Sequence, residues 1–253
     1  MCYKYAPYNC VPYKLRDWVP LEKLSWIGLS ENINAINLLS ENKNKIVWNW
    51  ISQNPNAIEL LKANIDNIVW YYLSMNPNAI DILEQHTDKI KWDVLSMNPN
   101  GIKLLEENQQ HIDWYNLSAN PSAIELLKKN KEKINWDMLS LNPNAIKILE
   151  NNKNKIDWYF LAENPNAIHM LDDGANNVNW PLDMDKSYRE IYDFLSKNPN
   201  ATKILQNNLS KINWDFLSSN TGAISIIEKN LSKINWNSLS SNPSAIHILE
   251  ANQ

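Results

Sequence analysis

A tryptophan recurs every 22 residues along this chain, and much of the sequence between successive tryptophans recurs with it. Seven tryptophans keep this step without a slip: Trp26, Trp48, Trp70, Trp92, Trp114, Trp136 and Trp158. Trp180 also keeps it, but the phase then shifts by 12 residues, so that Tyr192 takes the tryptophan position before Trp214 and Trp236 resume the period. A short fixed period is typical of arrays in which each copy packs mainly on its neighbours. The 253 residues therefore predict one array of ten repeats instead of two globular domains.

The first half of each repeat predicts a short helix. Positions are counted here from the tryptophan, and position +3 is always Leu or Ile. The ring, the residue at +3 and the Ile at −2 then share one helix face. Asp or Asn often stands at −1, where its side chain can cap the free N–H groups of the helix. These expected caps are Asp113, Asn135, Asp157, Asn213 and Asn235.

The second half predicts another helix, started by an Asn-Pro pair. Position +6 is Asn in all ten repeats and +7 is Pro in eight, a pattern in which Asn caps the helix and Pro fills its first turn. Apolar residues follow at +9, +10, +12 and +13, for example Ala145, Ile146, Ile148 and Leu149, and they form one broad face. Helices this short are unstable alone, so stacking must hold them. The predicted fold is an all-α solenoid of about ten 22-residue two-helix repeats; a leucine-rich-repeat horseshoe is less favoured, because Asn-Pro interrupts its strand pattern.

Three regions are expected. Residues 1–16 form a Tyr- and Pro-rich tail that holds the two cysteines, Cys2 and Cys10, which we interpret as reduced thiols. Residues 17–25 are expected to be a capping half-unit, and 26–253 the solenoid, with an insertion at 181–191. The spacing of apolar residues predicts that the insertion prolongs the following helix by about two turns, with Asp183 or Asp185 as its cap. Whether the insertion is merely tolerated or serves as a docking knob is left open.

One family resemblance is carried by these residues. The segment Asp17-Trp18-Val19-Pro20-Leu21-Glu22-Lys23-Leu24 and the repeated pattern Trp-x-x-Leu-Ser-x-Asn-Pro-x-Ala-Ile-x-Leu-Leu-Glu resemble the short-repeat proteins of giant DNA viruses related to mimivirus. The resemblance covers about residues 15–253. It implies a viral protein made in an infected protist, located in the host cytoplasm or the virion, and it implies no catalytic residues. The leading residues lack the apolar core of a signal peptide, and no apolar run is long enough to predict a transmembrane helix.

The sequence predicts no catalytic, cofactor or metal site. His86 and His111 fall in expected turns, while His169 and His247 share position +11 on the polar side of the second helix, and all four are expected to be solvated. Ser at +4 recurs in nine repeats, which favours a structural role over a nucleophile. The net charge of −4, without a basic stripe, argues against nucleic acid as a partner.

The positions that vary between repeats predict an interaction surface. Positions +1, +2 and +5 share the free face of the first helix, and in the middle repeats they are rich in aromatic residues and Met, as protein interfaces are. The candidate protein-binding residues are Trp50, Tyr71, Tyr72, Met75, Val94, Met97, Tyr115, Met138, Leu141, Tyr159 and Phe160. For +2, packing against the neighbouring first helix is an equally good interpretation. The repeated tryptophans themselves are expected in the core instead of forming a stacking platform for bases or sugars.

The predicted function is a non-enzymatic repeat scaffold that mediates protein–protein interaction in the infected cell. The alternative is a structural component of the virion, such as a minor capsid or capsid-associated protein, for which self-association is expected. No cofactor is predicted for either role.

Overall fold

The computed structural model describes residues 19–171 and 188–252, and all regular elements within these ranges are helical. The helices come in pairs that recur with the sequence period, so the predicted all-α solenoid fold is confirmed. The chain divides into two compact units, 1–122 and 123–253, which we describe separately. Their described parts are called the N-terminal array (19–122) and the C-terminal array (123–252).

Each repeat consists of a first helix (helix A), a second helix (helix B) and, in most repeats, a single 3-10 turn. The A helices of the N-terminal array are α1 (Trp26–Glu31), α3 (Trp48–Gln53), α5 (Trp70–Met75), α7 (Trp92–Leu95) and α9 (Trp114–Ala119), and its B helices are α2 (Ile36–Glu41), α4 (Ile58–Lys62), α6 (Ile80–Gln85) and α8 (Ile102–Glu107). The A helices of the C-terminal array are α11 (Trp136–Leu141), α13 (Trp158–Glu163), α15 (Tyr188–Lys197), α17 (Trp214–Ser219) and α19 (Trp236–Ser240). Its B helices are α10 (Ile124–Lys129), α12 (Ile146–Glu150), α14 (Ile168–Leu171), α16 (Thr202–Gln206), α18 (Ile224–Ile227) and α20 (Ile246–Ala251).

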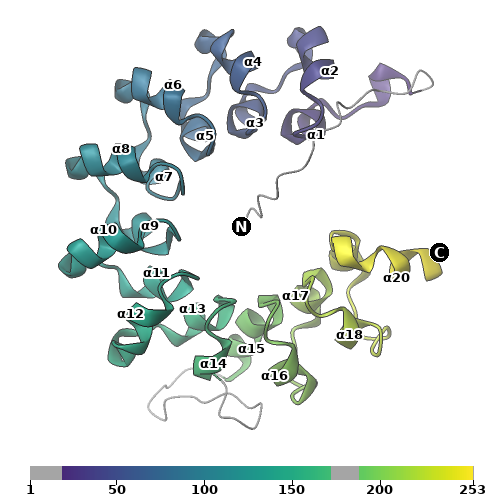
Figure 1. Cartoon of the computed structure of the whole chain (residues 1–253). Coiled ribbons are helices and arrows are strands. Elements are labelled where there is room, and N and C mark those ends of the chain that lie inside the picture. Colours follow the sequence, from purple (N-terminus) through teal and green to yellow (C-terminus); the bar gives the residue numbers. More distant parts are fainter. Residues whose placement is uncertain (1–18, 172–187, 253) are drawn as a thin grey trace. The chain divides into compact units, whose positions relative to one another are not determined.

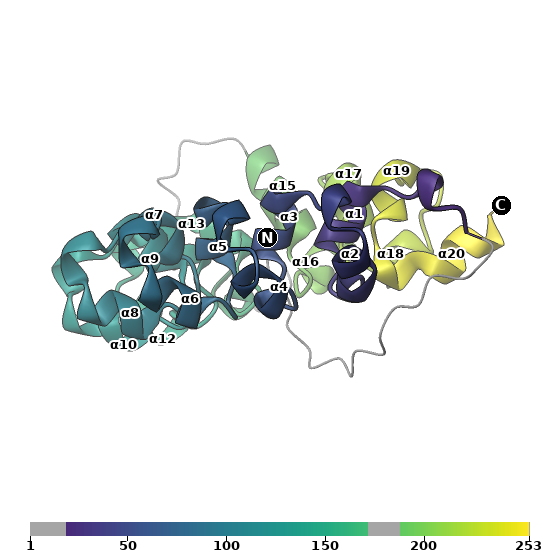
Figure 2. The ribbon, with the colours of Figure 1, turned by 90° about the horizontal axis from the view of Figure 1, so that it is seen from above.

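Within each array the A helices form one row and the B helices another (Figure 1). Seen from above, the rows are separate layers (Figure 2). Neighbouring A helices, such as α3 and α5 or α11 and α13, pack directly on each other, whereas neighbouring B helices approach less closely. Each array taken alone therefore bends with its A row on the inner side (Figure 1).

The 3-10 turns end each repeat and lead into the next helix A. They span Lys43–Lys45, Ile65–Asn67, Thr87–Lys89, Gln109–His111, Lys131–Lys133 and Lys153–Lys155. The turn at Leu21–Lys23 has the same position relative to the first tryptophan, within the region expected to be a capping half-unit. Residues 1–16 lie outside the described residues.

A core of small and aliphatic side chains fills the space between the rows. In the repeat of α11 and α12, Leu139, Ala145 and Leu149 at +3, +9 and +13 are fully buried, as are their equivalents in the other described repeats with few exceptions. The Ile at −2 is also buried, for example Ile134 and Ile156. Burying aliphatic side chains from three short elements per repeat supplies the stability that each helix lacks alone.

The predicted caps of helix A are confirmed, but the predicted start of helix B is wrong. Asp113, Asn135, Asp157, Asn213 and Asn235 each accept a hydrogen bond from a backbone N–H in the first turn of the following helix A. Helix B, however, begins at +10, preceded by Ala at +9, and the Asn-Pro pair forms a turn ahead of it. Asn at +6 caps this turn, since its Oδ1 accepts from the N–H at +8, as Asn98 does from Asn100 at 3.0 Å. Only in the last repeat does Pro243 open a 3-10 helix that Asn242 caps.

The asparagines at +6 form a buried ladder that joins successive repeats. Nδ2 of Asn98 donates to the carbonyl oxygens of Ser74 and Asn76 in the preceding repeat, both at 3.1 Å. The same pair of bonds recurs at Asn76 and Asn120 in the N-terminal array and at Asn164, Asn220 and Asn242 in the C-terminal array. Buried amides that satisfy both donors and their oxygen fix the register between repeats, because a shift would strand polar groups away from water.

The serines at +4 connect each repeat to the one that follows it. Oγ of Ser74 donates to the carbonyl of Trp70 at 2.8 Å and accepts from the backbone N–H of Lys91, just before the next helix A, at 3.1 Å. Equivalent bonds join Ser52 to Val69 and Ser140 to Asp157. The structural role expected for this serine is thus visible in its contacts.

The described tryptophans that open the A helices are half-buried, apart from the exposed Trp236, so they line the edge of the core instead of filling it as expected. In three repeats the residue at +19, the last residue of the turn that ends the repeat, lies over the ring. His111 stacks on Trp92 at 4.8 Å, Lys155 Nζ lies 4.5 Å from the Trp136 centroid, and Lys233 Nζ lies 5.4 Å from that of Trp214. In these three repeats one face of the ring is therefore covered by a side chain of the same repeat.

The phase shift leaves the ladder intact. Nδ2 of Asn198 donates to the carbonyls of Ala162 (2.8 Å) and Asn164 (3.0 Å), although 36 and 34 residues separate them. Helix α15 has ten residues where other A helices have four to six, so it is prolonged, by four residues relative to Tyr192. Trp180, the expected caps Asp183 and Asp185, and most of the insertion at 181–191 lie outside the described residues.

Candidate functional site

The free face of the A helices in the N-terminal array carries a group of exposed aromatic and Met side chains. Tyr71 and Met75 on α5, Met97 immediately after α7 and Tyr115 on α9 are 39–52% exposed. They occupy +1 and +5 of three consecutive repeats, so they follow one another along the inner side of the array. We call these four residues the Tyr/Met surface.

Position +2 lies in the seam between adjacent A helices. Trp50 and Tyr72 are half-buried, with ring centroids 6.3 Å apart. Val94, at the same position, has a short side chain and is only 4% exposed. The prediction that Val94 belongs to the interaction surface is therefore wrong. Tyr72 also contacts Tyr71 edge-on at 5.4 Å. Position +2 thus supports the surface from beneath, in keeping with the packing interpretation.

The same face also contains polar residues. Asp93 at +1 of α7 lies between the repeats of Tyr71 and Tyr115, is exposed, and has no ion-pair partner among the described residues. Its backbone carbonyl accepts from Nδ2 of Asn116 on α9 at 3.2 Å. The A helices of this array contain no Lys or Arg, and their acidic residues are Glu31 and Asp93. The face is therefore apolar, aromatic and weakly acidic.

The predicted residues of the C-terminal array are covered more fully. Met138, Leu141 and Phe160 are half-buried, and Tyr159 is only 8% exposed. Tyr159 is covered by the neighbouring helix α15, where Phe194 meets the Tyr159 ring at 6.0 Å and the Phe160 ring at 6.4 Å. Burial, reinforced by the carboxylates of Glu190 and Asp157, raises the pKa of the Tyr159 phenol above its ordinary value. Tyr159 was predicted to contact a partner, but its burial makes it unavailable.

Two aromatic residues at +2 of this array were not among the predicted residues. Phe194 and Phe216 share the ammonium group of Lys197, whose Nζ lies 5.0 Å and 4.7 Å from their ring centroids. The signal that could have found them is the period itself, since both occupy the position of Trp50 and Phe160 once the phase shift is allowed for.

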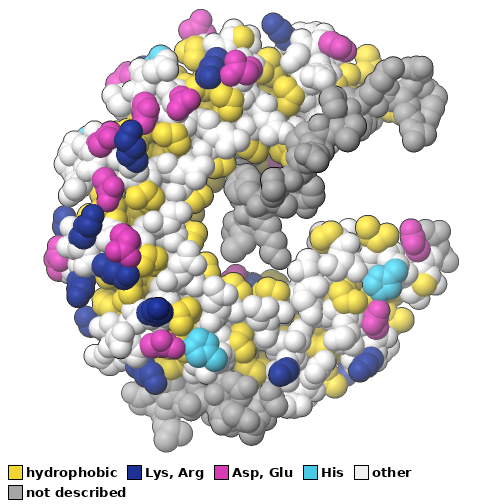
Figure 3. Space-filling view, in the orientation of Figure 1, with side chains coloured by type: hydrophobic (Ala, Val, Ile, Leu, Met, Phe, Trp, Pro, Cys, Tyr) yellow, Lys and Arg dark blue, Asp and Glu magenta, His cyan; other side chains and the backbone are white. Residues whose placement is uncertain are grey.

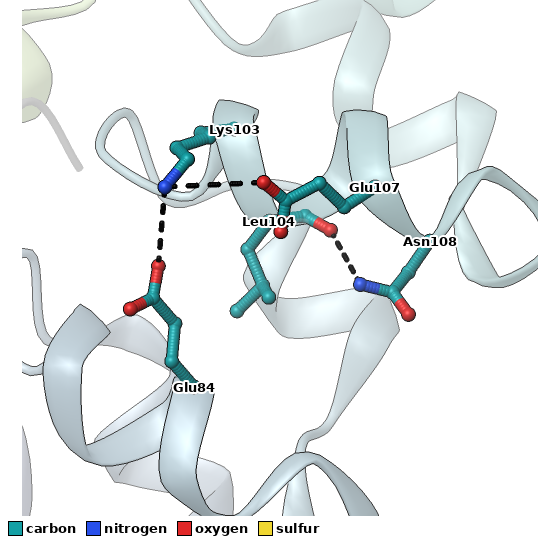
Figure 4. Close-up of polar contacts among 5 residues, drawn as sticks. All are labelled: Glu84, Lys103, Leu104, Glu107 and Asn108. Carbon is teal, nitrogen blue, oxygen red and sulfur yellow. Dashed lines mark hydrogen bonds and ion pairs between the residues drawn. The ribbon is translucent and has the colours of Figure 1, made fainter.

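The B helices carry charges that pair between repeats. Lys103 Nζ on α8 lies 4.0 Å from Glu84 on α6 and 3.8 Å from Glu107, while Nδ2 of Asn108 donates to the Leu104 carbonyl at 2.9 Å (Figure 4). In the visible face of each array, Lys, Arg, Asp and Glu gather on the outer side and hydrophobic side chains follow the inner side (Figure 3). The two surfaces thus differ in chemistry.

The histidines are integrated in this framework instead of being simply solvated. His169 and His247 are exposed, but each contacts a Glu at +14 of the preceding repeat, at 3.1 Å from Glu150 and 2.9 Å from Glu228. His86 packs on Trp70 at 5.1 Å. Among residues 19–171 and 188–252 no three His, Cys, Asp or Glu side chains are grouped as metal ligands, and no helix there is long and apolar enough to cross a membrane.

Comparisons with protein-family models, with curated proteins and with solved structures gave no significant match.

Proposed function

We propose that this chain is a non-enzymatic repeat scaffold that binds another protein through the Tyr/Met surface of its N-terminal array. The observation that carries the proposal is the exposure of Tyr71, Met75, Met97 and Tyr115 on consecutive repeats of one face. Exposed large apolar side chains elsewhere in this array are Leu21 and Ile27, and none is on a B helix. Side chains of this size cost solvation free energy when left in water, and their concentration on one face is typical of an interaction site.

The chemistry of the surface suits a protein ligand. Tyr and Met are enriched at protein interfaces, where Tyr offers a large contact area for few rotatable bonds. The seam residues Trp50 and Tyr72 hold the surface from below, so the partner meets a preformed face. The described A helices of this array contain no His or Cys, and their serines at +4 are buried.

Site-specific photocrosslinking tests the proposal. A photoreactive amino acid at Met97 is expected to give a discrete crosslinked product in the cells that normally make the protein. The matched control carries the same group at Lys103, which is more exposed than Met97 but lies on α8. The product should disappear when Tyr71 and Tyr115 are both changed to Ser. Equal products from both positions, or a product that persists in the double variant, would contradict the proposed surface.

The setting implied by the resemblance is part of the proposal: the partner is met in an infected cell. A second candidate, a structural component of the virion, is favoured by the last repeat, where Trp236 and Ile246 are 42% and 58% exposed. Self-association through these residues should appear as concentration-dependent sedimentation that Trp236→Ser and Ile246→Ser together abolish. Presence of the protein in purified particles would support this candidate, and its absence would leave the scaffold role.

A further inference from the structure

We propose that residues 1–16 of the same chain bind, in an extended conformation, along the A-helix face of the N-terminal array. This rests on the proposed function in one respect, because it assigns a competitor to the Tyr/Met surface that a partner has to displace.

Charge complementarity is the first step. The A helices of the N-terminal array carry Glu31 on α1 and Asp93 on α7 as their charged residues, and neither has an ion-pair partner among the described residues. Residues 1–16 carry the opposite charge only: Lys4, Lys14 and Arg16 are present, and there is no Asp or Glu. The segment and the face therefore carry opposite charges, with the two carboxylates of the face on α1 and α7.

The spacing of these charges is the second step. Packed helices lie about 8–10 Å apart, so the three repeat steps from Glu31 to Asp93 cover roughly 25–30 Å. Ten residues separate Lys4 from Lys14, which in a polyproline-type extended chain span about 31 Å. Pro7 and Pro12 lie between them and favour that conformation. The two pairs, Lys14 with Glu31 and Lys4 with Asp93, can thus form together.

The direction of the chain fits the same register. Val19 is the first described residue and lies just before the turn Leu21–Lys23 that leads into α1. Lys14 is five residues from Val19 and Lys4 fifteen, and fifteen extended residues reach about 50 Å. Lys14 is therefore within reach of the near end of the array and Lys4 of the far end, with the segment antiparallel to the order of the repeats.

Side-chain chemistry at the far end is the third step. Asp93 lies at +1 between the repeats of Tyr71 and Tyr115, and Lys4 lies between Tyr3 and Tyr5 in the sequence. A lysine stem packs well along aromatic and Met side chains while its ammonium meets a carboxylate or the face of a ring. The Tyr-Lys-Tyr sequence is thus complementary to an acidic residue set among tyrosines.

Disulfide trapping in the full chain tests the proposal, because Cys2 and Cys10 are its only cysteines. In a Cys10→Ser background that keeps Cys2 next to Lys4, a second cysteine replaces Met97 beside Asp93. Oxidised glutathione takes up the two electrons as the two thiols lose their protons and join. At low protein concentration we expect an intramolecular Cys2 disulfide, seen by peptide mass mapping, at least tenfold faster than in the matched Lys103→Cys control on α8.

Charge reversal separates binding from chance encounter. Adding Asp93→Lys should slow trapping at position 97 at least threefold, and adding Lys4→Asp to that variant should restore it. Equal rates at positions 97 and 103, insensitivity to both reversals, or a product that links two chains instead of one would overturn the proposal. Circular dichroism of each variant checks that the helices are intact. The outcome is independent of photocrosslinking to a partner, so this inference and the proposed function can fail separately.

Discussion

At the scale of single residues, the asparagine at +6 has two roles, and its sequence context predicts only one of them. Asn-Pro predicts a cap, and Oδ1 of Asn98 does accept from a nearby N–H. Its amide group, however, donates to two carbonyls of the repeat before it. Local sequence contains no information about that partner, because the partner lies 22 to 24 residues away and depends on how repeats stack.

Asn98→Ala is expected to lower the free energy of unfolding by about 1–3 kcal/mol, since it leaves the buried Ser74 carbonyl without its donor and removes one of the two donors to the Asn76 carbonyl, which keeps the N–H of Ala79. Asn32→Ala is the matched control. Asn32 has the same position in the first repeat and accepts from Asn34 at 2.9 Å, but it is exposed, so its loss should cost about 1 kcal/mol or less. Urea titration of both variants measures the difference. Equal losses would mean that the ladder contributes no more than the turn.

Two glycines give a second contrast. A Cβ at Gly101 would lie 2.8 Å from Cδ1 of Leu95, a side chain that can turn aside, and every other repeat has Ala at this position. A Cβ at Gly222 would collide with the backbone carbonyl of Pro199, and a backbone group cannot turn aside as a side chain can. Gly222→Ala should therefore destabilise by about 1–3 kcal/mol, whereas Gly101→Ala should change stability by less than about 1 kcal/mol. Thermal unfolding of the two single variants compares them directly.

Tyr159 gives a pH dependence. Its pKa is raised in the folded chain, first by burial, so the folded state holds the phenolic proton more tightly than the unfolded state does. The resulting stability is fully present below the ordinary tyrosine pKa, about 10, and is lost as the pH rises through the folded value. Above pH 10 the wild type should lose stability more steeply than Tyr159→Phe. Parallel curves between pH 9 and 11.5 would contradict this cause.

At the scale of elements, the period predicted two helices per repeat, and their existence and order are confirmed. The start of helix B was wrong by three residues, because Asn and Pro serve a turn instead of the first helical turn. Helix A was placed well since its cap and its Trp are adjacent. The turn predicted at Asn152-Lys153-Asn154-Lys155 is confirmed, but its polar residues show no apolar period that would have identified the turn as 3-10.

The serine at +4 and its exception make a prediction at this scale. Ser74→Ala leaves the N–H of Lys91 without its acceptor, so a loss of about 1–2 kcal/mol is expected. Ala162 is the natural exception, and the residue at −1 of the next helix A is Ile191, one turn inside α15, where its N–H belongs to the helix pattern. Ala162→Ser should therefore bring no comparable gain. Chemical denaturation of both variants checks the pair.

At the scale of the whole molecule, the sequence distinguished some residues of the interaction face from residues of the core. Positions +1 and +5 gave the exposed residues Tyr71, Met75, Met97 and Tyr115. The prediction was wrong for Val94 and Tyr159, which are both buried. Val94 has a short side chain, and Tyr159 is covered by the neighbouring helix α15. The period assigns a helix face, but the depth of a side chain within that face depends on its neighbours.

Surface and core should accordingly respond differently to substitution. Changing Tyr71 and Met97 together to Ser is expected to alter the free energy of unfolding by no more than about 1 kcal/mol. Leu73→Ala, in the same helix as Tyr71 but fully buried, should cost about 2–5 kcal/mol. Hydrogen exchange of each variant shows whether the effect spreads to adjacent repeats. A large loss in the surface variant would place those residues in the core.

Within each array, the Asn ladder has a direction. Every rung donates backwards, to carbonyls that precede it in the chain, so each needs only residues that leave the ribosome before it does. A growing chain can therefore seat each repeat on the one already made, without waiting for residues still to be translated. Nascent chains stalled at 22-residue intervals should then gain protease resistance in steps, one repeat at a time.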